Sequence, residues 1–231
     1  MNWEITGSAD WTKEIDNRAD KEAIAAQLAQ RAQSGDVVGI GSGSTAYLAV
    51  IALAERIKSE GLDIKCVATS YEAESYCVTL GLPVTTLNDH RPDWCFDGAD
   101  EIDGDGNMIK GRGGAFVREQ LVFAAAKKRI ILADPSKIVS RLGEKFPVPL
   151  GVVPEAANLV RNELQRKLGS VPEVRPAGGK DGGVINEQAC TVMDLPIDGS
   201  LAPAELEKIL LTTPGISATG LFIGYDYELI K

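Results

Sequence analysis

Residues 37–46 read VVGIGSGSTA, in which a short apolar run is followed by a glycine-rich turn and then by an apolar pattern at helical spacing. The run Val37–Ile40 predicts a buried strand, and the pattern over 46–57 predicts a helix. Glycines allow a sharp turn between them, and the first amides of the helix then favour a phosphate, with the serine and threonine hydroxyls of the turn as extra donors. A glycine turn that serves only the close packing of strand and helix is an equally good interpretation of this stretch alone.

The spacing of the glycines narrows the choice of ligand. A dinucleotide fingerprint is G-x-G-x-x-G, with an acidic residue at the end of the second strand. Here the spacing is G-x-G-x-G, and the expected second strand, 64–68, is followed by Thr69 and Ser70, with Glu72 inside the next expected helix. No Gly-Lys-Ser/Thr of a P-loop follows the turn. A compact phosphate monoester therefore fits better than NAD or ATP.

Outward from this turn, helical and strand patterns alternate. A helix capped by Asp16 or Asn17 and closed by Gly35 precedes the first strand. The later elements of this part, in chain order, are a strand at 64–68, a helix at 71–80, strands at 84–87 and 94–96, a helix at 114–126 and a strand at 129–133. This alternation predicts an α/β fold with a doubly wound, mostly parallel, Rossmann-like sheet.

The pattern changes at Phe146-Pro147-Val148-Pro149, where prolines interrupt the alternation. The elements expected beyond it are a helix at 155–168, strands near 171–175 and 184–193, and a helix at 203–211. The run 220–224 is typical of a strand, and we expect it to rejoin the first sheet. The sequence therefore predicts a Rossmann-like domain of residues 1–145 plus 215–231 and a smaller α+β domain of residues 146–214.

The composition excludes several classes of function. Of the 231 residues, 44% are hydrophobic, and 24 basic against 33 acidic side chains give a formal net charge of −9, which argues against a nucleic-acid-binding surface. The four cysteines form no C-x-x-C pair, and the single histidine, His90, is interpreted as a plain loop residue, so we expect no metal site. The first 17 residues contain no apolar run typical of a leader, and no segment approaches the roughly 20 apolar residues of a membrane span. We expect a cytoplasmic protein with reduced thiols.

Carboxylates and cations concentrate between residues 97 and 119. Asp97 follows the expected strand 94–96, and open α/β sheets bind their ligands at the carboxyl ends of strands. So many carboxylates in one loop repel one another unless a cation or a function compensates. The residues leave open a metal site, a solvated acidic loop and acid–base machinery around a polar substrate. Lys110 beside the carboxylates and an already anionic phosphate make a magnesium ion unnecessary.

The same segments resemble the A-type ribose-5-phosphate isomerases. The resemblance is carried by DGADEI at 97–102, KGRGGA at 110–115, Arg118-Glu119, the loop GSGSTA at 41–46, ADPSK at 133–137 and FPVP at 146–149. These segments follow the family's order and span about Lys21 to Gly224. Several linked motifs in one order are more specific than any single glycine loop.

The resemblance implies a cofactor-free aldose–ketose isomerase that interconverts D-ribose 5-phosphate and D-ribulose 5-phosphate through a cis-enediol(ate), in the non-oxidative branch of the pentose phosphate pathway. It implies that Glu119 is the carbon base and that Asp97, Asp100 and Lys110 surround the sugar hydroxyls. The substrate-binding residues that it implies are Ser42, Gly43, Ser44, Thr45, Gly98, Ala99, Gly111, Arg112 and Gly113, with Lys21 and Lys137 as phosphate-side cations. It also implies a homodimer or homotetramer.

Three segments depart from the family pattern. Arg112 replaces a glycine; an anion contact and a solvent-facing side chain are both open, and the second is slightly favoured. Asn186–Cys190 replace Thr-Asp-Asn-Gly-Asn, and 215–218 replace Gly-Val-Val-Glu. These changes leave open a paralogous isomerase for another aldose or aldose phosphate. A non-catalytic sugar-phosphate sensor is disfavoured, because binding alone needs no carbon base.

Overall fold

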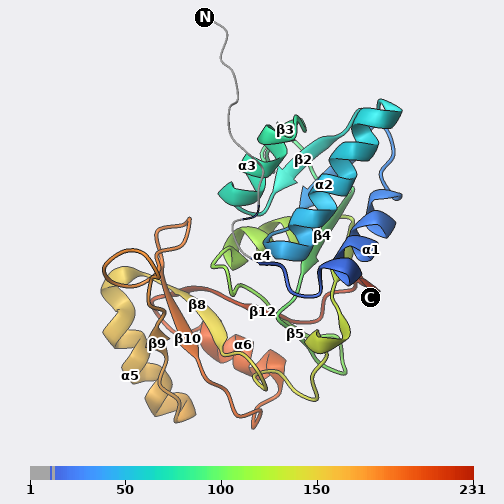
Figure 1. Ribbon diagram of the computed structural model, residues 1–231. Helices are drawn as coiled ribbons and strands as arrows, with labels where there is room; N and C mark the ends of the chain where they lie inside the picture. The colour runs from blue at the N-terminus through green and yellow to red at the C-terminus, as the bar shows by residue number, and fades with distance from the viewer. Residues whose placement is uncertain (1–10, 12–13) are drawn as a thin grey trace, which may run out of the picture. The chain divides into compact units, whose positions relative to one another are not determined.

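The computed structural model describes residue 11 and residues 14–231 (Figure 1). The expectation that the first 17 residues form no leader falls mainly on residues 1–10 and 12–13, which lie outside the described residues. Trp11 is described: its backbone N–H donates to Tyr47 Oη at 3.2 Å, and the two rings lie 5.4 Å apart. Within the described part of the chain, no helix is both long and apolar enough to cross a membrane.

The chain divides into two compact units. The first contains the described residues up to Gly98, together with Leu121–Asp134 and Tyr227–Lys231, and the second contains Ala99–Gln120 and Pro135–Asp226. These bounds differ from the expected domains, because 99–120, 135–145 and 215–226 all group with the second unit. The expected boundaries near 145 and 215 stay a prediction about independently folding parts of the chain.

A parallel sheet forms the centre of the first unit. Its described strands are β1 (Val37–Ile40), β2 (Lys65–Ala68), β3 (Val84–Thr85), β4 (Trp94–Gly98), β7 (Lys128–Leu132) and β13 (Glu228–Ile230). They are arranged β13-β7-β4-β1-β2-β3, and every neighbouring pair is parallel. The chain adds strands on one side of β1 and then, from β4, on the other. The predicted α/β fold with a doubly wound parallel sheet is confirmed, and its topological switch point lies between β1 and β4.

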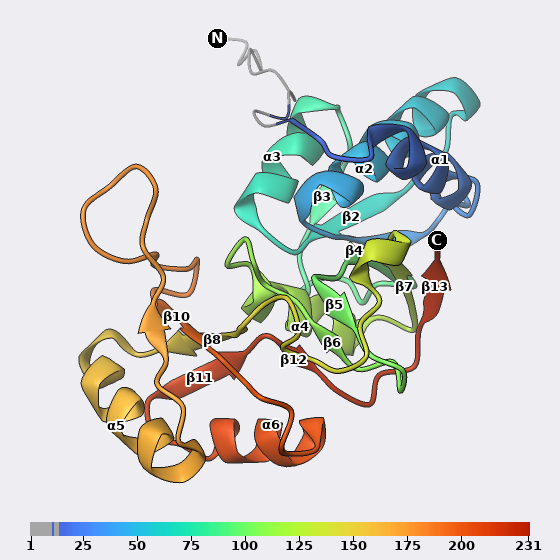
Figure 2. The ribbon, with the colours of Figure 1, turned by 60° about the horizontal axis from the view of Figure 1, so that its bottom comes forward.

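Helices cover both faces of this sheet (Figure 2). The helices on one face are α1 (Arg18–Ala29), α2 (Gly43–Glu60) and α3 (Tyr71–Thr79), and the carboxyl-terminal part of α4 (Phe116–Ala125) lies on the other. The apolar face of α1 is buried and includes Ile24 and Leu28. The side-chain cap expected from Asp16 or Asn17 is wrong. Asn17 occupies the N-cap in a left-handed conformation, φ 52°, instead of the extended one that a capping side chain requires.

The second unit is built from two smaller antiparallel sheets. The described strands of the first sheet are β5 (Glu101–Ile102), β6 (Met108–Ile109) and β12 (Leu221–Phe222), in the order β12-β6-β5. Those of the second are β8 (Val148–Val152), β9 (Glu173–Val174), β10 (Thr191–Leu195) and β11 (Ile216–Thr219), in the order β11-β8-β10-β9. Helices α5 (Ala157–Leu168) and α6 (Pro203–Leu211) bury Leu164 and Leu206 against them, and 3₁₀ turns cover Pro135–Lys137 and Pro154–Ala156.

One strand prediction in the second half of the chain is wrong, and another is confirmed only in part. The run 220–224 does not rejoin the parallel sheet, because β12 pairs with β6 and the strand that pairs with β7 is β13. The strand expected near 184–193 is confirmed only over 191–193, which begin β10, and residues 186–190 before it form a tight turn. Asn186 Oδ1 accepts the N–H groups of Gln188 and Cys190 at 3.0 and 2.9 Å, and this local side-chain bonding closes the turn.

Candidate active site

The glycine-rich turn at the end of β1 passes very close to β4. A Cβ placed on Gly41 would lie 2.4 Å from Phe96 O and 2.6 Å from Asp97 Cα, so only glycine fits there. The next residue, Ser42, donates its backbone N–H to Asp97 Oδ1 at 3.0 Å. Gly43 then begins α2 with φ +84°. The sequence placed this turn and Asp97 on strands that we expected to be parallel, and the structure brings them together at the switch point.

Hydroxyl and ammonium groups surround the same turn. Ser42 Oγ lies 2.7 Å from Thr69 Oγ1, at the end of β2, and Lys21 Nζ donates to Ser44 Oγ at 3.2 Å. Ser42, Ser44 and Thr45 are half-buried, Gly43 is exposed, and all four lie at the start of α2, where free amides and the helix dipole attract an anion. The predicted group Lys21, Ser42 and Ser44 is therefore assembled. Thr69 was not among the predicted site residues, although it directly follows the second strand.

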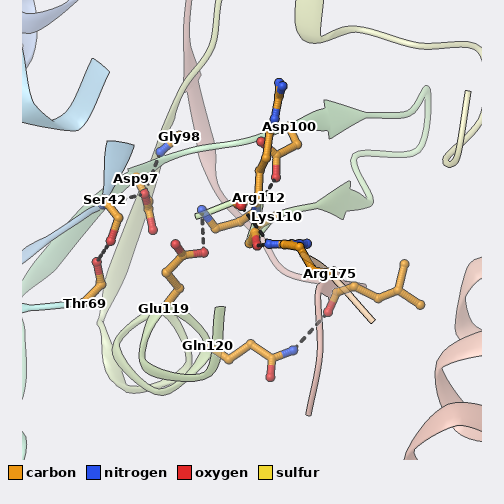
Figure 3. A network of polar contacts seen from close by, with 12 residues as sticks. Ser42, Thr69, Asp97, Gly98, Asp100, Lys110, Arg112, Glu119, Gln120 and Arg175 are labelled. Carbon is orange, nitrogen blue, oxygen red and sulfur yellow. Dashed lines mark hydrogen bonds and ion pairs between the residues drawn. The ribbon is translucent and has the colours of Figure 1, made fainter. Parts of the chain in front are cut away.

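Asp97 is held by backbone donors. It is 3% exposed, and its Oδ1 accepts the N–H groups of Ser42 and of Gly98, the latter at 2.8 Å (Figure 3). Two amide donors on one oxygen fix the orientation of the carboxylate. Asp97 thus stabilises the turn, and a role for it in moving protons of a substrate stays a prediction. Gly98 is half-buried at the end of β4, and Ala99 is buried.

In the second unit, Lys110 and Glu119 form a buried ion pair. Lys110 directly follows β6, and its backbone N–H donates to Gly220 O at 2.9 Å. Glu119 lies in the first turn of α4. Lys110 Nζ is 3.2 Å from Glu119 Oε2, and the two side chains are only 3% and 6% exposed. Figure 3 shows the carboxylate rising from the helix toward the lysine. A desolvated carboxylate beside a fixed cation is a suitable arrangement for a general base.

Asp100 lies among cations of the same unit. Its Oδ2 accepts the backbone N–H of Arg112 at 3.0 Å. Burial raises the pKa of Asp100 above its ordinary value, and Lys110, the N–H of Arg112, the Lys137 ammonium and the Arg112 guanidinium oppose that rise. A carboxyl group with a raised pKa can donate and accept a proton near neutral pH more readily than an exposed one. The predicted residues Asp100, Lys110, Arg112 and Glu119 are thus carried by one continuous stretch of this unit.

The glycine loop after Lys110 has a defined conformation. Gly111 adopts φ +99°, and a Cβ there would lie 2.6 Å from the Phe116 side chain, so this position requires glycine. Arg112 and Gly113 are exposed. The Arg112 guanidinium carbon lies 4.7 Å from the centre of the Phe146 ring, and Lys137 Nζ lies 5.8 Å from the same centre. Arg112 is exposed, as slightly favoured from the sequence, but it also contacts the Phe146 ring. That contact could not be expected, because Phe146 lies 34 residues later in the sequence and gave no local signal.

Two further features of the second unit were not among the predicted site residues. Glu101 is fully buried, and its carboxylate accepts the N–H groups of Gly143, Lys145 and Phe146 at 2.5–2.7 Å, which fixes the loop that carries the Phe146 ring. Arg118 pairs with Glu187 at 3.0 Å, which links α4 to the turn 186–190. That turn departs from the family pattern, and Ala189 stands in it with φ +59°. Within the described residues, no three His, Cys, Asp or Glu side chains gather as they do around a metal ion.

Comparisons with known proteins identify relatives over most of the chain. A model of the family "Ribose 5-phosphate isomerase A (phosphoriboisomerase A)" matches residues 65–230. Ribose-5-phosphate isomerase A of Synechococcus sp. is 44% identical over 206 residues, which cover 88% of each chain. The structure of ribose 5-phosphate isomerase A from Methanocaldococcus jannaschii aligns with a TM-score of 0.88 at 34% identity, over 91% of this chain and 93% of that one. A D-ribose-5-phosphate isomerase in complex with phospho-erythronic acid aligns with a TM-score of 0.86 at 32% identity, over 90% and 91%.

Proposed function

The chain belongs to the ribose 5-phosphate isomerase A family, and from this premise we propose that it interconverts D-ribose 5-phosphate and D-ribulose 5-phosphate, with Glu119 as the group that moves the carbon-bound proton. It is an aldose–ketose isomerase. The proposal for Glu119 rests on one observation. Its carboxylate, in the first turn of α4, is buried and lies 3.2 Å from the Lys110 ammonium. A related D-ribose-5-phosphate isomerase binds phospho-erythronic acid, a sugar-acid phosphate, which supports a pentose phosphate as the substrate.

The chemistry assigns a task to each group of the second unit. The Glu119 carboxylate takes the proton from C2 of the open-chain aldose, and the electron pair of that bond forms the C1–C2 double bond of an enediolate. The negative charge that develops on oxygen is stabilised by the Lys110 ammonium and by amides of the loop 111–114. For the reaction to balance, the hydroxyl proton on O2 must also move to O1. Returning the carbon-bound proton from Glu119 to C1 then leaves the carbonyl at C2 and a hydroxyl at C1, and it restores the carboxylate. Asp100, whose pKa is raised by burial, exchanges hydroxyl protons during ring opening, and Asp97 is the other candidate for this step.

The phosphate of the same substrate is assigned to the start of α2. Backbone N–H groups and hydroxyls of Ser42–Thr45 are suited to a dianion, and Lys21, which already donates to Ser44 Oγ, adds positive charge. Lys137 lies in the 3₁₀ turn that follows β7 along the chain and is the second proposed phosphate-side cation. Gly98, Ala99, Gly111, Arg112 and Gly113 are the proposed contacts to the sugar.

The test of this function is a panel of phosphorylated and free pentoses, tetroses and hexoses assayed with EDTA present. We expect ribose 5-phosphate to give the highest kcat/KM and EDTA to have no effect, because none of the assigned steps uses a metal ion. If a different aldose or aldose phosphate were turned over best, the result would instead support a paralogous isomerase. This alternative is motivated by the altered turn 186–190, in which Ala189 has φ +59°. Binding of sugar phosphates without turnover of any would support a sensor.

Lys137→Ala should weaken the use of phosphorylated sugars selectively. A hydrogen bond to a charged partner contributes about 1.5–3 kcal/mol, so KM for ribose 5-phosphate should rise about 10-fold or more, whereas the slow turnover of free ribose should not change. The matched control is Lys58→Ala, which removes an exposed lysine from the last turn of α2. An equal loss for free and phosphorylated sugars would remove Lys137 from the phosphate site.

We further propose that the enzyme acts in the cytoplasm, in the non-oxidative branch of the pentose phosphate pathway, as a homodimer or homotetramer. The support is the family membership, since an enzyme that uses free pentose phosphates belongs where these metabolites are made and consumed. Sedimentation of the purified protein distinguishes the two assemblies from a monomer.

A further inference from the structure

The guanidinium of Arg175 makes four hydrogen bonds within the second unit. Nε and Nη2 bind Asp194 Oδ2 and Oδ1 at 2.8 and 2.5 Å, and Nη1 donates to Gly111 O at 3.1 Å and to Arg112 O at 2.7 Å. Asp194 thus fixes one edge of the planar group. The other edge binds the backbone of the glycine loop, and Arg175 is seen beside Arg112 in Figure 3. Such a fork–fork pair is more rigid than a single contact, and it is well shielded here, at 17% and 22% side-chain exposure.

This contact fixes one peptide unit at both of its ends. The carbonyl of Gly111 accepts from Arg175, and the N–H of the same peptide, which belongs to Arg112, donates to Asp100 Oδ2 at 3.0 Å. Because the peptide group is planar, holding its C=O also sets the direction of its N–H. A continuous chain of hydrogen bonds therefore runs from Asp194 through Arg175 and the 111–112 peptide to the Asp100 carboxylate. Each bond in such a chain polarises the next.

Arg175 and Asp194, at the start of this series of hydrogen bonds, are held by the second unit's larger sheet. Arg175 follows the edge strand β9, its backbone N–H donates to Val192 O at 2.9 Å, and its carbonyl accepts from Val184 N at 2.8 Å. Asp194 lies within β10, where it stands opposite Glu173 of β9 in the antiparallel register. Both ends of the ion pair are thus fixed by sheet pairing. The glycine loop has a further bond of its own, from Gly114 N–H to Gly111 O at 2.9 Å, and Arg175 ties this turn to the sheet.

We propose that Arg175, with Asp194, is a positioning residue that holds Asp100 and the loop 111–113 in the geometry needed for isomerisation. The inference rests on the proposed function and extends it to two residues that do not belong to the proposed substrate-binding set. We call the Arg175–Asp194 pair the clamp. Loss of its hydrogen bonds should lower kcat rather than substrate affinity, because the groups that it aligns serve the reacting carbons and oxygens and not the phosphate.

The test compares Arg175→Lys and Asp194→Asn with Arg161→Lys. Lysine keeps the charge of Arg175 but cannot bind Asp194 and both carbonyls together. The control alters a second two-bond arginine–carboxylate pair, Arg161 with Glu173, which is more exposed and does not touch the loop. We expect kcat to fall about 10-fold in both clamp variants with KM nearly unchanged, and the control to stay at the wild-type value.

The pH profile gives a readout that a merely structural role would not move. The charged groups that face Asp100 are Lys110, Arg112 and Lys137, all of which favour its ionised form. A misdirected Arg112 N–H removes one further stabilisation of that form, so the pKa of Asp100 rises. The acid limb of kcat/KM should therefore move to higher pH in both clamp variants and not in Arg161→Lys. An unchanged kcat and acid limb, or a fall in activity that only follows the loss of folded protein on melting, would overturn the proposal.

Failure of this inference is distinguishable from failure of the proposed function. The wild-type enzyme reports on the function alone, since it must turn over ribose 5-phosphate in the substrate panel. If the wild-type enzyme is active and both clamp variants match it, only the clamp is refuted. If Arg175→Lys does not fold, Asp194→Asn, which leaves the arginine in place, decides the question by the same two readouts.

Discussion

Glu119→Gln should lower kcat for the ribose 5-phosphate reaction by about 10²-fold or more, because an amide cannot accept the C2 proton. KM should change little, since the groups assigned to the phosphate, Ser42–Thr45 and Lys21, are untouched. The measurement is steady-state turnover together with exchange of the C2 hydrogen for solvent deuterium. Both should fall in parallel, because both require the same proton to leave carbon.

The control for this variant is Glu187→Gln. Glu187 also pairs with a basic side chain of the second unit, Arg118, at 3.0 Å, but its side chain is 22% exposed and pairs with a residue that is assigned no proton-transfer role. It should retain most of the activity. Unaltered C2 exchange in Glu119→Gln would show that another group takes the proton. Asp100 would then be the first candidate, because its pKa is already raised by burial.

Much of the first unit could be predicted from the sequence because its signals are local. Val37–Ile40 is a strand with the predicted bounds, and the turn at Gly41 leads into α2 as expected. In an alternating chain, the parallel order and the switch point follow from connection rules that need no detailed packing. The second unit was harder, because its antiparallel strands follow no regular alternation with helices and several of them pair with partners far along the chain. The apolar run 220–224 could not reveal that β6, more than 100 residues earlier, is its partner.

Some residues of the candidate site could likewise be predicted from the sequence, and others could not. Asp97, Asp100, Lys110 and Glu119 lie within 23 positions of sequence, so one dense stretch and its resemblance to a family identified them together. Arg175 could not be found in this manner. Arg175 follows Gly111, whose carbonyl it binds, by 64 residues in the sequence. An isolated arginine after a short edge strand is typical of a solvated surface. Phe146 was quoted only as part of a proline-rich segment, since an aromatic ring reveals its cation partners only when the fold is known.

Lys110→Met should affect both stability and catalysis, because it leaves the Glu119 carboxylate buried without its cation. Breaking one side of a buried ion pair costs about 3–5 kcal/mol of folding free energy, mostly as the penalty of an uncompensated charge. Losing the proposed donor to the enediolate oxygen should lower kcat by a further 10²–10³-fold, in the range of about 3–4 kcal/mol known for a lost oxyanion donor. Urea unfolding and turnover measure the two effects separately.

The double variant Lys110→Met/Glu119→Gln separates them further. With both charges gone, no unpaired ion remains at a site where the two side chains are 3% and 6% exposed, so the free energy of unfolding should recover most of the 3–5 kcal/mol or so lost in the single variant. Activity should not recover, because the carbon base and the oxygen donor are both absent. Stability that stays low would show that the methionine packs badly, and the loss in Lys110→Met would then not report on charge. Activity that returns with stability would show that the pair only holds the fold, and the isomerisation would have to proceed through other groups.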